Sequence, residues 1–321
     1  MHTKTRPHLQ SVLIPVDKTE HSERAVKFAA RLVSPISPEI TKKVTLIHII
    51  AYSYLEKMAS NIDIRFKNIL ESPLFKRILE QHVEKEVNPF LEEFAKIFKE
   101  NKFSGELEKH ISQGEPGKEI VTFAEKNNIE SIIMGRRKRS HTAETLLGSC
   151  SHIVIHRAKK QNIFIVGQEV REEGCPVNKI LVPVDGSRPS YRAVKEAAAI
   201  ANCFPEGMVQ VSIISVLDPI YLDQNSDEEK EVHKIIEKAR QILKDEGLND
   251  GQINSYLEFG DPGRTIARIA DEEGFPLIMM GRTGKSGLRE IVLGSVSTRV
   301  IHKVEKATVG LVPIKNGDFI D

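Results

Sequence analysis

The stretch ILVPVDGSRPSYRAVKEAAAIA, residues 180–201, places a short apolar run before a loop and an amphipathic segment. The stretch VLIPVDKTEHSERAVKFAARLV, residues 12–33, repeats the same order. Its first five residues, Val12–Val16, are almost all apolar, which is typical of a strand in a parallel sheet with both faces covered. In the segment that follows, the apolar residues that share one helical face are Ala25, Val26, Ala29, Ala30 and Val33. Each stretch therefore predicts a strand, a loop and a helix.

The repeat continues along the rest of the chain. Residues 42–50 match 209–217, residues 111–135 match 257–281, and residues 146–156 match 292–302. A unit of this length is a duplicated domain, since solenoid repeats span only about 20–50 residues. We predict a first domain over residues 1–171, a linker over 172–178 and a second domain over 179–321. The linker falls in the charged stretch REEGCPVNK, which Gly174 and Pro176 interrupt.

Further apolar runs alternate with amphipathic segments in each half. In the first half we expect buried strands at Thr45–Ile50, Ser131–Met134 and Ile163–Val166. The segment GKEIVTFAEKNN, residues 117–128, again has the spacing of an amphipathic helix. Alternating strands and helices predict an α/β fold with parallel strands joined by right-handed crossovers.

The first half is longer than the second at one place. The copies are offset by 168 residues at Asp17 and Asp185 but by 146 residues at Gly135 and Gly281, so the first half carries 22 additional residues. They fall between the second and third predicted strands, where residues 52–102 have the pattern of long charged helices. This insert is interpreted either as a binding surface or as solvated helices that cover the edge of the sheet.

Composition excludes several classes of function. A chain of 321 residues fits two domains, and its net charge of +1 gives no overall attraction to nucleic acid. No apolar run approaches the roughly 20 residues of a membrane span. The start of the sequence, MHTKTRPHLQ, lacks the apolar core of a secretion signal, and the three cysteines form no CxxC pair. We expect a cytoplasmic protein without disulfides and without contacts to membranes or nucleic acid.

The segment MGRTGKSGLREIVLGS, residues 280–295, contains GKS, which also ends a Walker-type phosphate loop. That loop requires another glycine at position 279, where Met279 stands, so this is not a P-loop. Glycines still allow backbone N–H groups to approach a phosphate closely. The pair Gly294-Ser295 precedes a predicted helix, whose start offers unpaired N–H donors, and the hydroxyls of Ser295 and Ser297 add further donors. Asp185, at the end of the first strand, suits ribose hydroxyls or an amino group better than a phosphate.

The spacing Gly281-x2-Gly284-x9-Gly294-Ser295, together with VPVDGS and GDPGRTIARIA, resembles the ATP-binding subgroup of the universal stress protein family. The resemblance covers nearly the whole chain, twice. It implies two Rossmann-like domains of the adenine nucleotide α-hydrolase type, each with a five-stranded parallel sheet. It also implies pairing through the last strands, here as an intrachain pseudo-dimer, and leaves open a homodimer of whole chains. The implied ligand is ATP or AMP, and accompanying Mg²⁺ stays an open alternative.

The family pattern assigns contact residues in the second domain. The positions implied for adenine and ribose are Pro183, Asp185 and Val216. The positions implied for phosphate are Gly281, Gly284, Gly294, Ser295, Val296 and Ser297. Met280 and Thr283 match lesser contact positions. The resemblance implies no catalytic residue.

The first domain keeps part of this pattern. The retained positions are Asp17, Ile49, Gly135, Gly148 and Ser149. Lys138 replaces the glycine that corresponds to Gly284, and a side chain there costs roughly 1–2 kcal/mol through a clash or a left-handed backbone. That cost weakens binding about 5- to 30-fold. Two interpretations remain: a degenerate, structural site, or a site that still binds a nucleotide or another anion through the basic run at residues 136–139.

Three functions follow as hypotheses. The first is an adenine-nucleotide-binding protein of stress response or signalling, with an unknown protein partner. The second is a slow ATPase or an autophosphorylating protein, although no general base or carboxylate pair for Mg²⁺ stands beside the predicted phosphate site. The third is a scaffold that no longer depends on nucleotide and binds a partner through the inserted helices.

Two further patterns have plain interpretations. His152 and His156 have the i, i+4 spacing of helical metal ligands, but no third ligand is evident, so no metal site is expected. Cys150 follows the glycine and serine of the first-domain loop and is expected to be a small buried thiol, with a redox role as the alternative.

Overall fold

The computed structural model describes residues 4–60, 72–137, 148–217, 226–284 and 293–313. The first domain contributes five strands, namely β1 (Ser11–Pro15), β2 (Lys43–Ala51), β3 (Glu106–Gly114), β4 (Ser131–Gly135) and β5 (Asn162–Val166). They lie in the order β3-β2-β1-β4-β5, and every neighbouring pair is parallel. The four strands predicted from apolar runs, together with β3, for which no strand was predicted, form the five-stranded parallel sheet that the resemblance implies.

The second domain repeats this sheet. Its strands are β6 (Lys179–Pro183), β7 (Gln210–Leu217), β8 (Ile253–Phe259), β9 (Leu277–Gly281) and β10 (Thr308–Val312). The order β8-β7-β6-β9-β10 is again parallel throughout. The last strands of the two domains pair antiparallel, with Gly310 opposite Phe164, and join the halves into one ten-stranded sheet.

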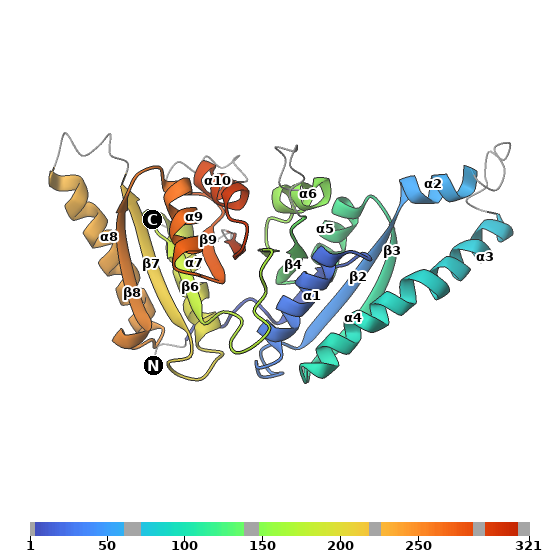
Figure 1. Cartoon of the computed structure of the whole chain (residues 1–321), viewed down its shortest axis with the longest axis horizontal. Helices are drawn as coiled ribbons and strands as arrows, with labels where there is room; N and C mark the ends of the chain where they lie inside the picture. Colours follow the sequence, from blue (N-terminus) through green and yellow to red (C-terminus); the bar gives the residue numbers. More distant parts are fainter. Residues whose placement is uncertain (1–3, 61–71, 138–147, 218–225, 285–292, 314–321) are drawn as a thin grey trace.

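Helices cover both faces of this sheet (Figure 1). One face carries α1 (Glu20–Val33), α4 (Asn88–Glu100), α7 (Arg188–Ala201) and α8 (Ser226–Asp245). The other face carries α5 (Pro116–Lys126), α6 (Ser149–Arg157), α9 (Pro262–Glu272) and α10 (Ser295–Lys303). Each face has its own apolar core, and each core contains residues of both domains. The junction between the domains is therefore part of both cores.

Local sequence explains where the second-domain helices begin. The Ser187 hydroxyl accepts a hydrogen bond from the backbone N–H of Ser190 at the start of α7. Asp261 caps α9 in the same way by accepting from the N–H of Arg264, and Pro262 occupies the first turn. Such caps satisfy N–H groups that have no partner inside the helix.

The inserted region of the first domain forms α2 (Tyr52–Ser60), α3 (Pro73–His82) and a π-helical turn (Val83–Val87) that leads into α4. Figure 1 shows α2 and α3 extending beyond the edge strand β3. A small separate cluster of Ile50, Leu55 and Phe75 holds this arm against β2. The helix α4 packs on α1, as α8 packs on α7 in the second domain, so the additional length lies mainly in α2, α3 and the turn.

Residues near the start of the chain contact the second domain. His8 donates its backbone N–H to Glu196 Oε1 at 2.8 Å, and its ring Nδ1 lies 2.7 Å from Glu196 Oε2. Glu196 also accepts from the Asn162 amide at 2.9 Å and is only 2% exposed. Thr5 binds Glu246 in a similar way. The N-terminal segment therefore ties the first domain to α7 and to the residue after α8.

Candidate functional site

A cavity of about 580 Å³ lies at the carboxyl ends of β6, β7 and β9 in the second domain. Parallel α/β sheets bind ligands at this edge because the loops and helix starts converge there. Every residue that the family pattern assigns to nucleotide contacts in this domain lines the cavity. These residues are Pro183, Asp185, Val216, Met280, Gly281, Thr283, Gly284, Gly294, Ser295, Val296 and Ser297.

The turn after β6 holds the Asp185 carboxylate. Asp185 Oδ1 accepts from the backbone N–H of Ser187 at 3.0 Å and from its hydroxyl at 2.5 Å. Gly186 between them has φ +83°, in the left-handed region that glycine adopts without a steric penalty. The motif VDGS therefore both begins α7 and orients a carboxylate at the rim of the cavity.

The glycines of the loop after β9 are required by close packing. A Cβ on Gly284 would lie 2.5 Å from Asp185 Oδ2, and a Cβ on Gly281 would lie 2.7 Å from the Pro189 side chain. Neither glycine has a left-handed backbone. A side chain at position 284 would therefore cost free energy through a steric clash with Asp185 and not through a left-handed backbone.

The start of α10 faces the cavity. Gly294 precedes the helix as its N-cap and, as a glycine, has no side chain that could cap the first turn. The N–H groups of a first helical turn lack intrahelical partners and favour an anion. The Ser297 hydroxyl donates to the Gly281 carbonyl at 2.9 Å, so its proton ties the helix to β9 instead of pointing to a ligand. This differs from the expectation that the Ser297 hydroxyl would donate to phosphate.

Two helices contribute residues to the cavity wall that were not predicted from the sequence. The helix α8 contributes Glu228, Glu231, Val232 and Ile235, and the start of α9 contributes Pro262 and Ile266. The repeated stretch GDPGRTIARIA could have identified the α9 residues as part of the site. The α8 residues lie where the two halves do not match, so the repeat gave no indication of them. The wall combines apolar residues such as Val216, Ile235 and Ile266 with the carboxylates of Asp185, Glu228 and Glu231 and the start of α10.

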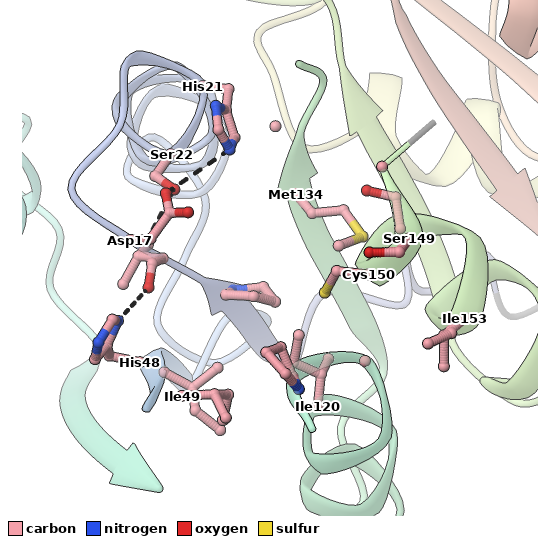
Figure 2. Close-up of a pocket in the computed structure, with 18 of the residues that line it drawn as sticks. Asp17, His21, Ser22, His48, Ile49, Ile120, Met134, Ser149, Cys150 and Ile153 are labelled. Atoms are coloured by element: carbon pink, nitrogen blue, oxygen red, sulfur yellow. Dashed lines mark hydrogen bonds and ion pairs between the residues drawn. The ribbon is translucent and has the colours of Figure 1, made fainter. Parts of the chain in front are cut away.

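A second cavity, of about 310 Å³, occupies the equivalent place in the first domain. It is lined by the retained positions Asp17, Ile49, Gly135, Gly148 and Ser149. Figure 2 shows Asp17, His21 and His48 on one side and Met134, Ser149 and Cys150 on the other. Lys138, the residue that replaces the loop glycine, lies outside the described residues. The first-domain pocket is thus smaller and differently lined.

Three further replacements in this pocket were not recognised from the sequence. His21, His48 and Arg137 stand where the second domain has Pro189, Ser215 and Thr283. Burial lowers the pKa of His21 and of His48, and the His48 Nδ1 lies 2.8 Å from the Val16 carbonyl. The repeat alignment carried the signal for these residues, because the alignment places each beside a retained site position.

Two further titratable groups of this pocket, Asp17 and Cys150, also have shifted pKa values. Burial opposes the ionisation of Asp17, but hydrogen bonds from Ser22 and Thr19 outweigh it and lower the pKa of the carboxyl. Burial raises the pKa of the Cys150 thiol to about 11, so at neutral pH the residue is a thiol rather than a reactive thiolate. The high pKa argues against a redox role, but Cys150 is half-buried and lines the cavity instead of being fully buried as expected.

Within the described ranges, no helix combines the length and the apolar character that a membrane span requires. Those ranges also contain no group of three or more His, Cys, Asp or Glu side chains arranged to hold a metal ion. His152 and His156 therefore remain a pair without a third such ligand among the described residues.

Known proteins match this chain in sequence and in structure. Universal stress protein MJ0531 of Methanocaldococcus jannaschii is 30% identical over 145 residues, covering 43% of this chain and 84% of that protein. A universal stress protein of Mycolicibacterium smegmatis is 25% identical over 295 residues, covering 90% of this chain and 92% of that protein. The crystal structure of a universal stress protein from Archaeoglobus fulgidus has the same fold. It matches with a TM-score of 0.68 at 21% identity and covers 95% of this chain and 98% of that one.

The sequence profile described as the universal stress protein family matches the chain twice, at residues 8–161 and 176–309. The first match spans β1 to β4 and ends just before β5, and the second spans β6 to β9 and ends within β10. They confirm the resemblance that the repeated motifs carry. The chain therefore belongs to the universal stress protein family and contains two tandem copies of its domain.

Proposed function

We propose that the chain is an adenine-nucleotide-binding protein and that its second domain holds the nucleotide, ATP or AMP. The observation that carries the proposal is the convergence of separate segments on one cavity. The turn after β6, the end of β7, the loop after β9 and the start of α10 together bring all eleven assigned residues to its wall. A cavity of about 580 Å³ also lies within the range of ligand pockets.

The chemistry of the wall matches the parts of a nucleotide. The apolar residues Val216, Ile235 and Ile266 suit the faces of a base, which gains by leaving water. The Asp185 carboxylate accepts hydrogen bonds and suits ribose hydroxyls. The N–H groups at the start of α10 suit phosphate oxygens, because the helix dipole places partial positive charge there.

The first domain is proposed to bind more weakly or to serve a structural role. Its cavity has little more than half the volume, about 310 Å³ against about 580 Å³. The side chains of His21, His48 and Arg137 take space that smaller residues leave open in the second domain. The unknown protein partner and the homodimer of chains remain proposals, and the arm of α2 and α3 is the surface that the scaffold hypothesis would use.

The test compares the two aspartates that hold equivalent positions. Isothermal titration of AMP into Asp185→Asn is expected to show about tenfold weaker binding than the wild type, because the amide replaces one acceptor oxygen by a donor. Asp17→Asn is the matched control and is expected to leave the affinity unchanged. Equal affinity in Asp185→Asn and the wild type, or a loss only in Asp17→Asn, would place the site elsewhere.

A further inference from the structure

Two buried arginines follow the strands that lead into the two pockets. Arg136 comes directly after β4 and Arg282 directly after β9, at equivalent places in the repeat. Their side chains are only 2% and 4% exposed. Each stands between two residues that line a pocket, but neither arginine lines a pocket itself. Their side chains therefore do not contact a ligand in these two pockets, and their role must lie in contacts within the protein.

Each guanidinium crosses the junction between the domains. Arg282 donates from Nη1 to the Ala158 carbonyl at 2.6 Å and from Nη2 to the Gln161 carbonyl at 3.1 Å, both in the first domain. Arg136 donates from Nη1 to the Ile301 carbonyl in the second domain at 2.5 Å. The two arginines therefore cross the junction in opposite directions, although their acceptors Ala158 and Ile301 are not equivalent positions in the repeat.

The acceptors lie at the ends of the two helices that start at the pockets. Ala158 is the C-cap of α6, and Ile301 lies in the last turn of α10. Carbonyls at a helix C-terminus carry partial negative charge and favour a cation. The same helices begin at Ser149 in the first cavity and at Ser295 in the second. Each helix, roughly 13 Å long, therefore runs from its own pocket to the arginine of the other domain.

Arg282 also contacts the start of α10 through its backbone. Its carbonyl accepts from the N–H of Gly294, the N-cap of that helix, at 2.8 Å. One residue thus joins the end of α6 in the first domain to the beginning of α10 at the second cavity. Burial lowers the pKa of Arg282 to about 10, so the side chain stays charged at neutral pH. A buried charge is stabilised by its hydrogen-bonding partners, so the first-domain carbonyls help to fix Arg282 and, through its own carbonyl, the N-cap of α10.

We propose that Arg136 and Arg282 are positioning residues that make nucleotide binding in one domain depend on the other. The proposal rests on the proposed nucleotide site of the second domain. Arg282 binds the N-cap of α10 at that site, and Arg136 binds the far end of the same helix. A substitution of Arg136, in the first domain, therefore shifts α10 and weakens nucleotide binding in the second domain.

Titration of the full-length chain with AMP tests this coupling. Arg282→Gln is expected to weaken AMP binding about tenfold and Arg136→Gln at least about fivefold, within the usual range of coupling between sites. Arg282→Lys and Arg136→Lys are expected to recover part of the loss, since an ammonium still donates to a carbonyl. Ile165→Val, which removes one methyl group from the same junction on β5, is expected to lower the unfolding midpoint without changing the affinity.

Hydrogen exchange without nucleotide gives a second readout. The amides of residues 293–299 are expected to exchange faster in both Gln variants than in the wild type and in Ile165→Val. Unchanged affinity and unchanged exchange in the Gln variants would overturn the proposal, as would equal effects in Ile165→Val. If the wild type itself binds no AMP, the proposed function fails, and the exchange rates alone decide whether the arginines position α10.

Discussion

At the scale of single residues, Gly284 lies so close to Asp185 that a side chain does not fit between the loop and the carboxylate. The spacing of the glycines identified this position in the sequence, but its reason lies in a contact between residues about a hundred positions apart. The Ser297 hydroxyl shows the limit of such reasoning: its partner is the Gly281 carbonyl, which no local pattern indicates.

Gly284→Ala tests the role of this close approach. The added Cβ, placed 2.5 Å from Asp185 Oδ2, must displace either the loop or the carboxylate. We expect AMP binding to weaken about five- to tenfold, equivalent to about 1 kcal/mol. Gly251→Ala is the control, since its Cβ would lie 3.3 Å from Asn249 Oδ1, a much looser approach outside both cavities. Wild-type affinity in Gly284→Ala, measured by isothermal titration, would contradict this account of the loop.

His48 makes the stability of the first domain depend on pH. Its pKa is lowered by burial, so the unfolded chain binds a proton more readily than the folded chain. The stabilisation is therefore present above pH ~6.5 and is lost as the pH falls below that value. In His48→Ser, which introduces the residue found at Ser215 in the repeat, the free energy of unfolding should fall less between pH 7.5 and 5.0. Urea titrations at several pH values measure this, and an unchanged slope would show that His48 does not contribute.

At the scale of elements, the apolar runs predicted β1, β2, β4 and β5 to within a few residues, and the amphipathic segments predicted α1 and α5. Strands β1, β2, β4 and β5 are buried on both faces, and their apolar runs identify them directly. The edge strand β3 is more exposed and polar, so it carries a weaker pattern. The wall that α8 adds to the second cavity was not predictable, because helix packing against a sheet depends on tertiary contacts that no local pattern encodes.

The N-terminal segment offers a test at this scale. Glu196 is buried and accepts from His8 and Asn162, so its removal leaves these donors unpaired. We expect Glu196→Ala to lower the free energy of unfolding by about 2–4 kcal/mol. The exposed Glu237→Ala on α8 is the comparison and should change it by less than about 0.5 kcal/mol. Chemical denaturation measures the free energy of unfolding of both variants. Equal free energies would show that the contacts of Glu196 with His8 and Asn162 contribute little to stability.

At the scale of the whole molecule, the antiparallel pairing of β5 with β10 makes one sheet from two duplicated domains. Both apolar cores cross the junction, and the two buried arginines cross it as well. Duplication within one chain has allowed the two pockets to diverge, which identical subunits of a dimer cannot do. The second domain has Pro189, Ser215 and Thr283 at three positions where the first has His21, His48 and Arg137.

The stoichiometry of nucleotide binding tests this account most directly. Ligand-free protein, prepared by unfolding and refolding or by extensive dialysis, is titrated with AMP and with ATP by calorimetry. We predict one nucleotide per chain at the strong site, removed or weakened by Asp185→Asn and unaffected by Asp17→Asn. Two equivalent sites per chain would contradict the divergence of the pockets. A flat titration at millimolar nucleotide would contradict nucleotide binding itself and favour the scaffold hypothesis.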